Sequence, residues 1–421
     1  MSSTALFRTD AESARRFERS GPIRVDTSLG AISLRLTSDL QSLEALWEEL
    51  QAKAPCGSAQ TYDWAKAWVR HMAGPEGHES VIVVGCAADG GALFLWPFEI
   101  QTALGLRVLT WLSQGHANYA MGLFAPGVAG KFTAGDISRL LRAVGREAGA
   151  AAAVLKGQPF SWEGVANPFA RLPGGLPSPS SGYAVTLGDY AAIYEARFSK
   201  RWRKGFERKE RKLAEAGPLT FGWGCSRDER LALLDTLFAQ RARQFAAMGV
   251  KDIFDVHARA FYRELALLEG DNPSRVRIGY LKVGDAVLAT FSGAICHDRF
   301  IATFSSLAEG ELQKYSPGSL LLNRQIEDAC RQGLAFYDIG VGAAVYKDQW
   351  CDVIQALFDN FIALKPQGLL VTLPLAASSR LKRAIKSNRH LWPLVQRLRA
   401  RFLGGTARAT AEPSDRGDAG E

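Results

Sequence analysis

A serine-proline-glycine sequence opens an apolar-faced segment in the last third of the chain, and its residue types suit the start of a helix. Ser316 can cap the first turn, and Pro317 fits the first helical position, where its missing N–H costs nothing. We expect the N–H groups of Gly318, Ser319 and Leu320 to stay free at a positively polarised helix end, an arrangement that binds anions. The same residues also suit an ordinary capped helix without a ligand.

A short apolar strand expected over residues 334–339 contains an aspartate and is followed by two glycines, then by a tyrosine and a lysine. Asp338 at a strand end could orient or deprotonate an amine. Tyr346 could give a proton to a leaving thiolate, because a hydrogen-bonded phenol is a competent acid. Lys347 could serve the same acceptor. In the alternative interpretation, Asp338 caps the turn and Tyr346 packs against Trp350.

The segment that holds both features, YSPGSLLLNRQIEDACRQGLAFYDIGVGAAVYKDQW (315–350), carries a family resemblance. It is similar to the C-terminal signature of the GNAT-type acyltransferases of bacterial cellulose and exopolysaccharide operons, which are distant relatives of the Fem-type peptidoglycan aminoacyltransferases. Upstream residues agree, and the resemblance spans about residues 31–363. The agreeing upstream parts are Trp47, residues 94–98 around Pro97, residues 105–107, the basic helix that ends at Gly217, and residues 245–249.

The resemblance implies a tandem pair of GNAT folds and direct transfer of an acyl group, taken as acetyl, from acyl-CoA. The acceptor would be an amine or hydroxyl of a cell-envelope or polysaccharide precursor. Direct transfer needs no covalent nucleophile, and no metal is implied. The residues expected to hold the CoA phosphates are Ser316, Gly318, Ser319 and Leu320. Gly318 is the only glycine in residues 311–318, where single-domain GNATs carry a glycine-rich loop.

Two other functions remain open from the sequence. One is Fem-like transfer of an aminoacyl group from tRNA, and the other is a non-catalytic GNAT-like scaffold at a membrane surface. Where relatives often carry an aspartate before a tyrosine, this chain has Asn118 and Tyr119. We therefore expect no catalytic role at that position.

Positive charge is concentrated in two segments, although the chain as a whole has a formal net charge of +8. The first is a helix expected over residues 191–216, with Arg201, Lys204 and Arg208 on its cationic face. These three could attract an anionic substrate such as a sugar nucleotide, a phosphorylated lipid or the 3′-phosphate of CoA. A merely solvated face is the alternative. Because the rest of the chain is mildly acidic, DNA binding is not expected.

The second basic segment, residues 380–402, combines eight lysines and arginines with apolar residues that include Trp392. Such a cationic amphipathic stretch is typical of an element that lies on an anionic membrane surface, or of one that docks on an acidic protein surface. The chain has no apolar run long enough to span a bilayer and no signal-like N-terminus. The expected location is the cytoplasm, either free or at the inner face of the membrane.

The order of the expected strands and helices predicts two α/β units with mixed, mainly antiparallel sheets, and these units would position the residues above. Of the 421 residues, 47% are hydrophobic, which is enough for well-filled cores. A strand, helices, antiparallel strands, a helix and a closing strand follow one another in each half. We expect a disordered leader (1–22), a first unit with a proline- and glycine-rich crossover (23–182), a second unit with the donor site (183–376), and a basic amphipathic tail with a disordered end (377–421). The six cysteines are scattered, as in a reduced protein, and the histidines lack the spacing of a zinc site.

Overall fold

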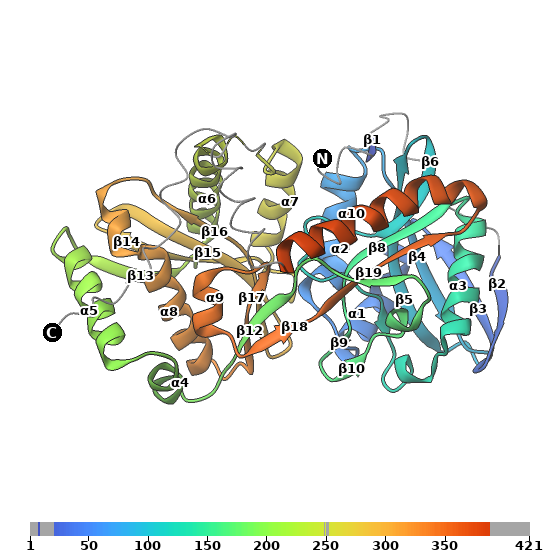
Figure 1. The fold of residues 1–421 in the computed structure, drawn as a ribbon, viewed down its shortest axis with the longest axis horizontal. Helices are drawn as coiled ribbons and strands as arrows, with labels where there is room; N and C mark the ends of the chain where they lie inside the picture. The colour runs from blue at the N-terminus through green and yellow to red at the C-terminus, as the bar shows by residue number, and fades with distance from the viewer. Residues whose placement is uncertain (1–6, 9–20, 248, 250–251, 388–421) are drawn as a thin grey trace.

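The computed structural model describes residues 7–8, 21–247, 249 and 252–387, which form two α/β units side by side (Figure 1). The first unit has a ten-stranded sheet with the order β11-β19-β8-β6-β5-β4-β3-β2, and the short strands β1 and β7 pair with β5. All described neighbours are antiparallel except β6 and β8. The strands that come from the first half of the chain are β1 (Phe7–Arg8), β2 (Ile23–Thr27), β3 (Gly30–Thr37), β4 (Glu79–Cys86), β5 (Ala92–Ala103), β6 (Leu106–Trp111), β7 (Leu123–Phe124) and β8 (Ala152–Pro159).

Helices cover both faces of this first sheet. Strand β4 shows why, because its side chains alternate between two buried clusters: Ile82 and Val84 lie in one, and Val81 and Val83 in the other. Helices α1 (Glu44–Lys53) and α2 (Tyr62–Trp68) contribute to the first cluster, and α3 (Ala134–Glu147) contributes to the second. A hairpin of β9 (Ser161–Trp162) and β10 (Val165–Ala166) follows β8.

The second unit repeats this arrangement around a seven-stranded sheet with the order β13-β14-β15-β16-β17-β12-β18. Its single parallel pair is β16 with β17, at the place that corresponds to β6 and β8 in the first sheet. The strands are β12 (Gly182–Thr186), β13 (Leu219–Trp223), β14 (Arg277–Val283), β15 (Ala286–Cys296), β16 (Arg299–Leu307), β17 (Phe336–Val341) and β18 (Val353–Gln355). The helices are α4 (Tyr190–Arg197), α5 (Lys200–Ala214), α6 (Arg227–Ala247), α7 (Val256–Ala266), α8 (Pro317–Arg331) and α9 (Val345–Trp350).

The two units share structure in two ways. After β18, the chain returns to the first sheet as β19 (Leu357–Ala363), which pairs with β8 and with the crossover strand β11 (Gly175–Pro177). Helix α10 (Leu369–Ser387) then packs on β8 and β19. One buried cluster also runs through both units, and in it Trp64 of α2 meets Phe261 of α7 edge to face at 5.1 Å. The chain therefore does not divide into two units at a single point.

The predicted fold class, α/β with mixed and mainly antiparallel sheets, is confirmed, but three local predictions need correction. The basic helix expected over 191–216 is two helices, because Phe198 is extended and Ser199 caps α5 by accepting a bond from the Trp202 N–H. Strand β1 lies within the expected leader and pairs with β5. Strand β19 joins the first sheet, although it lies in the range expected for the second unit.

Candidate functional site

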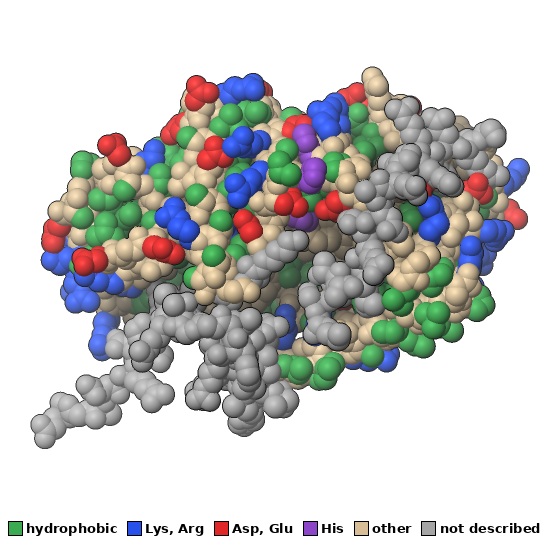
Figure 2. Space-filling view, turned by 90° about the horizontal axis from the view of Figure 1, so that it is seen from above, with side chains coloured by type: hydrophobic (Ala, Val, Ile, Leu, Met, Phe, Trp, Pro, Cys, Tyr) green, Lys and Arg blue, Asp and Glu red, His purple; other side chains and the backbone are tan. Residues whose placement is uncertain are grey.

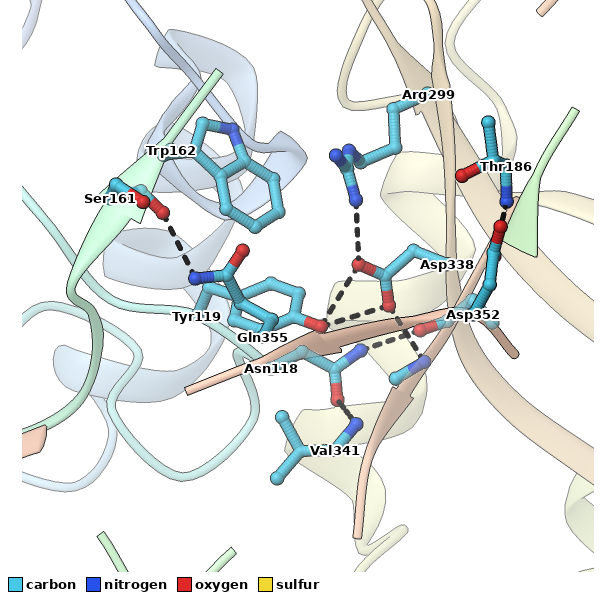
Figure 3. Close-up of polar contacts among 12 residues, drawn as sticks. Asn118, Tyr119, Ser161, Trp162, Thr186, Arg299, Asp338, Val341, Asp352 and Gln355 are labelled. Atoms are coloured by element: carbon cyan, nitrogen blue, oxygen red, sulfur yellow. Dashed lines mark hydrogen bonds and ion pairs between the residues drawn. The ribbon is translucent and has the colours of Figure 1, made fainter. Parts of the chain in front are cut away.

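Asp338 is fully buried in β17, at the seam between the two units, and both units supply its partners (Figure 3). From the first unit, the hydroxyl of Tyr119 lies 2.9 Å from each carboxylate oxygen, and it donates the hydrogen bond. From the second, the Gly340 N–H donates at 2.8 Å and a guanidinium nitrogen of Arg299 lies at 3.3 Å. Burial raises the pKa of Asp338, and these partners oppose the shift because they favour the charged form.

Tyr119 reaches Asp338 because its neighbours leave room for it and hold it. A Cβ at Gly182, at the start of β12, would lie 2.1 Å from the Tyr119 hydroxyl oxygen, so only glycine fits there. The side chain of Gln60 donates to the Tyr119 carbonyl at 2.8 Å, and the ring of Trp162 lies 4.7 Å away between centroids. Burial and the nearby Asp338 carboxylate raise the pKa of Tyr119, so it stays a hydrogen-bond donor.

Arg299 begins β16 and is itself buried. Its guanidinium lies over two aromatic rings, 4.7 Å from the Trp162 centroid and 4.3 Å from that of Phe336. These contacts replace water around the cation on two sides and direct it toward Asp338. The buried carboxylate thus has a buried counter-ion in a fixed place.

Strands β16 and β17 part next to Asp338. Their parallel pairing covers three residue pairs and stops at Ile301 and Asp338. Just beyond this point, the side-chain amide of Asn118 bridges the two strands: its NH2 group donates to the Ala302 carbonyl at 2.6 Å, and its oxygen accepts from the Val341 N–H at 3.4 Å (Figure 3). The amide lies against Gly340, which has a φ of +84°. The parted strands therefore present one carbonyl and one N–H that an amide can bind.

Lys347 on α9 is buried, and its ammonium group points at the backbone that follows Asp338. It donates to the Gly340 carbonyl at 2.9 Å and to the Val341 carbonyl at 3.4 Å. Burial lowers its pKa, and the charge of Asp338 opposes this. The structure thus brings Lys347 to the same turn as Asp338, and in this geometry the lysine fixes the turn.

Tyr346, its neighbour on α9, is half-buried. It packs beside the buried cluster that contains Trp350. Within the described residues its hydroxyl has no hydrogen-bond partner, and burial raises its pKa. The phenol therefore remains protonated at neutral pH and is free to donate.

The start of α8 differs from the prediction in two respects. Ser316 occupies the N-cap position with a left-handed backbone (φ +54°), so its side chain does not cap the helix and instead accepts a hydrogen bond from Lys209 at 2.9 Å. The N–H groups of Ser319 and Leu320 both donate to the Ser316 carbonyl, at 3.1 and 3.2 Å. Within the described part of the chain, only the Gly318 N–H at this helix start lacks a partner. The group available to an anion is one N–H, with the Lys209 ammonium beside it.

Helix α5 carries the basic residues expected to bind substrate. Arg201, Lys204 and Arg208 are all exposed on it. Lys209 of α5 donates a hydrogen bond to Ser316 at the start of α8, and Glu210 pairs with Arg324 of α8. The sequence thus pointed to the basic helix α5, but it did not identify Lys209 as the residue that reaches the start of α8.

Sequence reasoning missed two residues of this site, Lys209 and Arg299. It named Asn118 and Tyr119 but did not predict their contacts with the strands that part and with Asp338. An arginine directly before the apolar run of β16 was the available signal, because a charged residue in a buried strand needs a partner. Among the described residues, no group of three or more histidines, cysteines, aspartates and glutamates could hold a metal ion. No described helix is long and apolar enough to cross a membrane.

Comparisons with known proteins agree with this architecture. Residues 200–348 match the family model of the acetyltransferase (GNAT) domain. FemX is similar in fold over 80% of this chain and 100% of its own, with a TM-score of 0.52 at 10% identity. The C-terminal domain of a proposed lysylphosphatidylglycerol synthetase from Agrobacterium fabrum aligns over 82% of this chain and 97% of its own (TM-score 0.49, 11% identity).

A tandem GNAT protein from the clavulanic acid biosynthesis pathway aligns over 79% of this chain and 99% of its own, with a TM-score of 0.43 at 13% identity. No curated protein matches the chain. At 10% identity, the similarity to FemX is evidence for the fold alone. The family model covers the basic helix α5, the strands that part, the α8 start and Asp338. The part of the second unit from residue 200 to residue 348 thus matches an acetyltransferase (GNAT) domain.

Proposed function

We propose that the second unit transfers an acyl group, acetyl in the simplest case, from an acyl-CoA thioester to an amine or hydroxyl. The observation that carries the proposal is the buried Asp338 carboxylate, which both units hold where β16 and β17 part. From the resemblance of segment 315–350, the acceptor is proposed to be a cell-envelope or polysaccharide precursor. The exposed cations of α5 suit an acceptor or donor that carries phosphate.

An amine or hydroxyl that attacks a thioester must lose a proton, and Asp338 is the proposed base. Burial raises the pKa of its carboxyl toward the operating range, which makes it a stronger base than an exposed aspartate. The proton moves from the acceptor to the carboxylate as the new bond to the acyl carbon forms. The leaving thiolate takes a proton from the hydroxyl of Tyr346, which has no other partner in the described structure.

The phosphates of the donor are proposed to lie at the start of α8. The Gly318 N–H, the positive end of the 15-residue helix and the Lys209 ammonium would act together there. A side chain at Gly318 would crowd this place, since its Cβ would come within 2.8 Å of Leu307. Acyl-CoA supplies the activated acyl group, and the residues of this chain bind it and move the protons.

Calorimetric titration with acetyl-CoA tests the donor. The wild-type chain is expected to bind with micromolar affinity and Gly318→Trp to lose at least tenfold. Gly130→Trp, which alters an open glycine in the first unit, should bind as the wild type does. If neither acetyl-CoA nor longer acyl-CoA releases heat, the acyl-CoA proposal fails. Binding of charged tRNA in its place would then favour aminoacyl transfer, and binding of neither would favour the scaffold.

A further inference from the structure

Helix α10 turns an apolar face to the solvent, although its opposite face is already packed. Val371, Leu375 and Ser379 are buried against the first sheet, and the Ser379 hydroxyl lies 3.4 Å from Asp359 of β19. The outward side chains are therefore not needed to hold the helix in place. They are nevertheless hydrophobic, which is the reverse of an ordinary surface helix.

The exposed side chains follow helical spacing over the fifteen residues 370–384. Leu370, Leu373 and Leu381 are 64%, 62% and 62% exposed, among the most exposed large hydrophobic residues of the described chain. Pro374, Ala377 and Ala384 lie exposed on the same face between and beyond them. Figure 2 shows hydrophobic side chains at the lower right of the view, over the first unit, on which α10 packs. We call residues 370, 373, 374, 377, 381 and 384 the leucine face.

Positive charge adjoins the leucine face. Arg380 and Arg383 are exposed beside it, and the Lys386 ammonium anchors the end of the helix by donating to Ser180 at 2.6 Å. Residues 360–411 contain ten lysines and arginines and no aspartate or glutamate. The strand beneath the helix adds the half-buried Lys156. Any partner of this face must therefore be apolar in one part and anionic in another.

The charge pattern discriminates among possible occupants. A second copy packed through the same face would bring two cationic helices together, with no carboxylates in this segment to compensate. The remaining chain is basic from 388 to 411, so that part would be repelled in the same way. Its last ten residues, 412–421, carry four carboxylates and one arginine but no large apolar side chain, so they could not cover the leucines. An anionic lipid surface satisfies both requirements, because leucines enter the headgroup boundary while cations meet phosphates.

We propose that the leucine face of α10 docks the protein on the surface of an anionic phospholipid bilayer, with Arg380 and its basic neighbours against the headgroups. The proposal is independent of the acyl-transfer chemistry, because it concerns a face of the first unit that contains none of the site residues. It also extends the expectation drawn from residues 380–402 to the helix that precedes them.

Co-sedimentation of the full-length chain with vesicles tests the proposal. We expect binding to vesicles of phosphatidylglycerol and phosphatidylcholine in equal parts, at least tenfold weaker binding to pure phosphatidylcholine, and release in 0.5 M salt. Leu370→Gln with Leu373→Gln should weaken binding at least tenfold. The matched control is Val256→Gln with Ile354→Gln, two equally exposed apolar positions elsewhere, which should bind as the wild type does.

Other outcomes would overturn the proposal. One is the absence of binding to anionic vesicles, and another is unchanged binding after the two leucine substitutions. A third is complete loss of binding in full-length Leu391→Gln with Trp392→Gln, which would assign docking to the later segment alone. A concentration-dependent dimer in light scattering that the leucine substitutions abolish, without vesicle binding, would make a second copy the occupant. Unchanged thermal melting verifies that each variant folds.

Discussion

The Tyr119 hydroxyl donates to both oxygens of Asp338 at 2.9 Å, across a gap of 219 positions in the sequence. The first unit thereby contributes directly to the carboxylate that we propose as the base of the second. Asn118, its neighbour in the chain, bridges the strands that part beside the same carboxylate. Residues of both units therefore build the candidate site.

Tyr119→Phe is expected to move the pH dependence of acyl transfer. The substitution removes a hydrogen bond that favours the charged carboxylate, so the pKa of Asp338 should rise further above its ordinary value. Because the base must be deprotonated, the acidic limb of the kcat/KM profile should shift to higher pH. Tyr262→Phe, another fully buried tyrosine, serves as control. An unshifted limb in Tyr119→Phe would show that Asp338 is not the titrating base.

Arg299→Leu should destabilise the fold far more than removal of an exposed arginine. It would leave the buried Asp338 carboxylate without its counter-ion, at a cost of about 3–5 kcal/mol. Arg263→Leu breaks an ion pair with Asp235 in which both side chains are about half exposed, and it should cost less than about 1 kcal/mol. Denaturant unfolding of both variants measures the contrast. Similar losses would mean that Asp338 is not charged in the fold.

Asn118→Asp tests the bridge between β16 and β17. A carboxylate there would put an oxygen in place of the NH2 group that now donates to the Ala302 carbonyl at 2.6 Å. Its pKa should therefore rise on folding, and the destabilisation should appear as the pH rises above about 4, where a free aspartate ionises. Compared with Asn118→Ala at the same pH, Asn118→Asp should melt lower at pH 7 and about equally at pH 4. Equal melting at both values would argue against the bridge.

Glu99 on β5 gives a pH prediction independent of function. Burial raises its pKa to about 7, although Trp68 and Gln101 donate to it. Because the folded state favours protonated Glu99, protonation adds to the free energy of unfolding. This stabilisation is complete below pH about 4.5 and is lost as the pH rises through 7. The span is about 3 kcal/mol at most. Urea unfolding should show Glu99→Gln gaining stability relative to the wild type between pH 5 and 8. A constant difference would contradict the shift.

Much of the fold was predictable because its elements carry local signals. The order of strands and helices in each half predicted mainly antiparallel sheets, and the serine-proline-glycine sequence predicted where α8 begins. The break between α4 and α5 was missed because the cationic and apolar faces continue across it. Which sheet receives β19 was not predictable, since the run LFDNFIA fits either sheet equally well.

The candidate site was predictable only in part, for a related reason. Asp338 and Lys347 are nine positions apart, and the turn between them brings them together. The contacts of Asp338 with Tyr119 and Arg299 depend on how the units pack, which no local pattern encodes. The sequence predicted three free N–H groups at the start of α8, but only that of Gly318 lacks a partner in the described structure. The N–H groups of Ser319 and Leu320 both donate to the Ser316 carbonyl, because Ser316 has a left-handed backbone.

Acyl transfer by Asp338→Asn tests the central claim most directly. Release of the CoA thiol from acetyl-CoA would be followed with a panel of small amines and amino sugars as acceptors. Asparagine keeps the shape and can still accept from Tyr119, but it cannot take a proton, so kcat should fall at least 100-fold with KM for acetyl-CoA little changed. Asp359→Asn, a buried aspartate of β19 outside the site, should keep kcat within about threefold. An Asp338→Asn variant with kcat near that of the wild type would contradict the account.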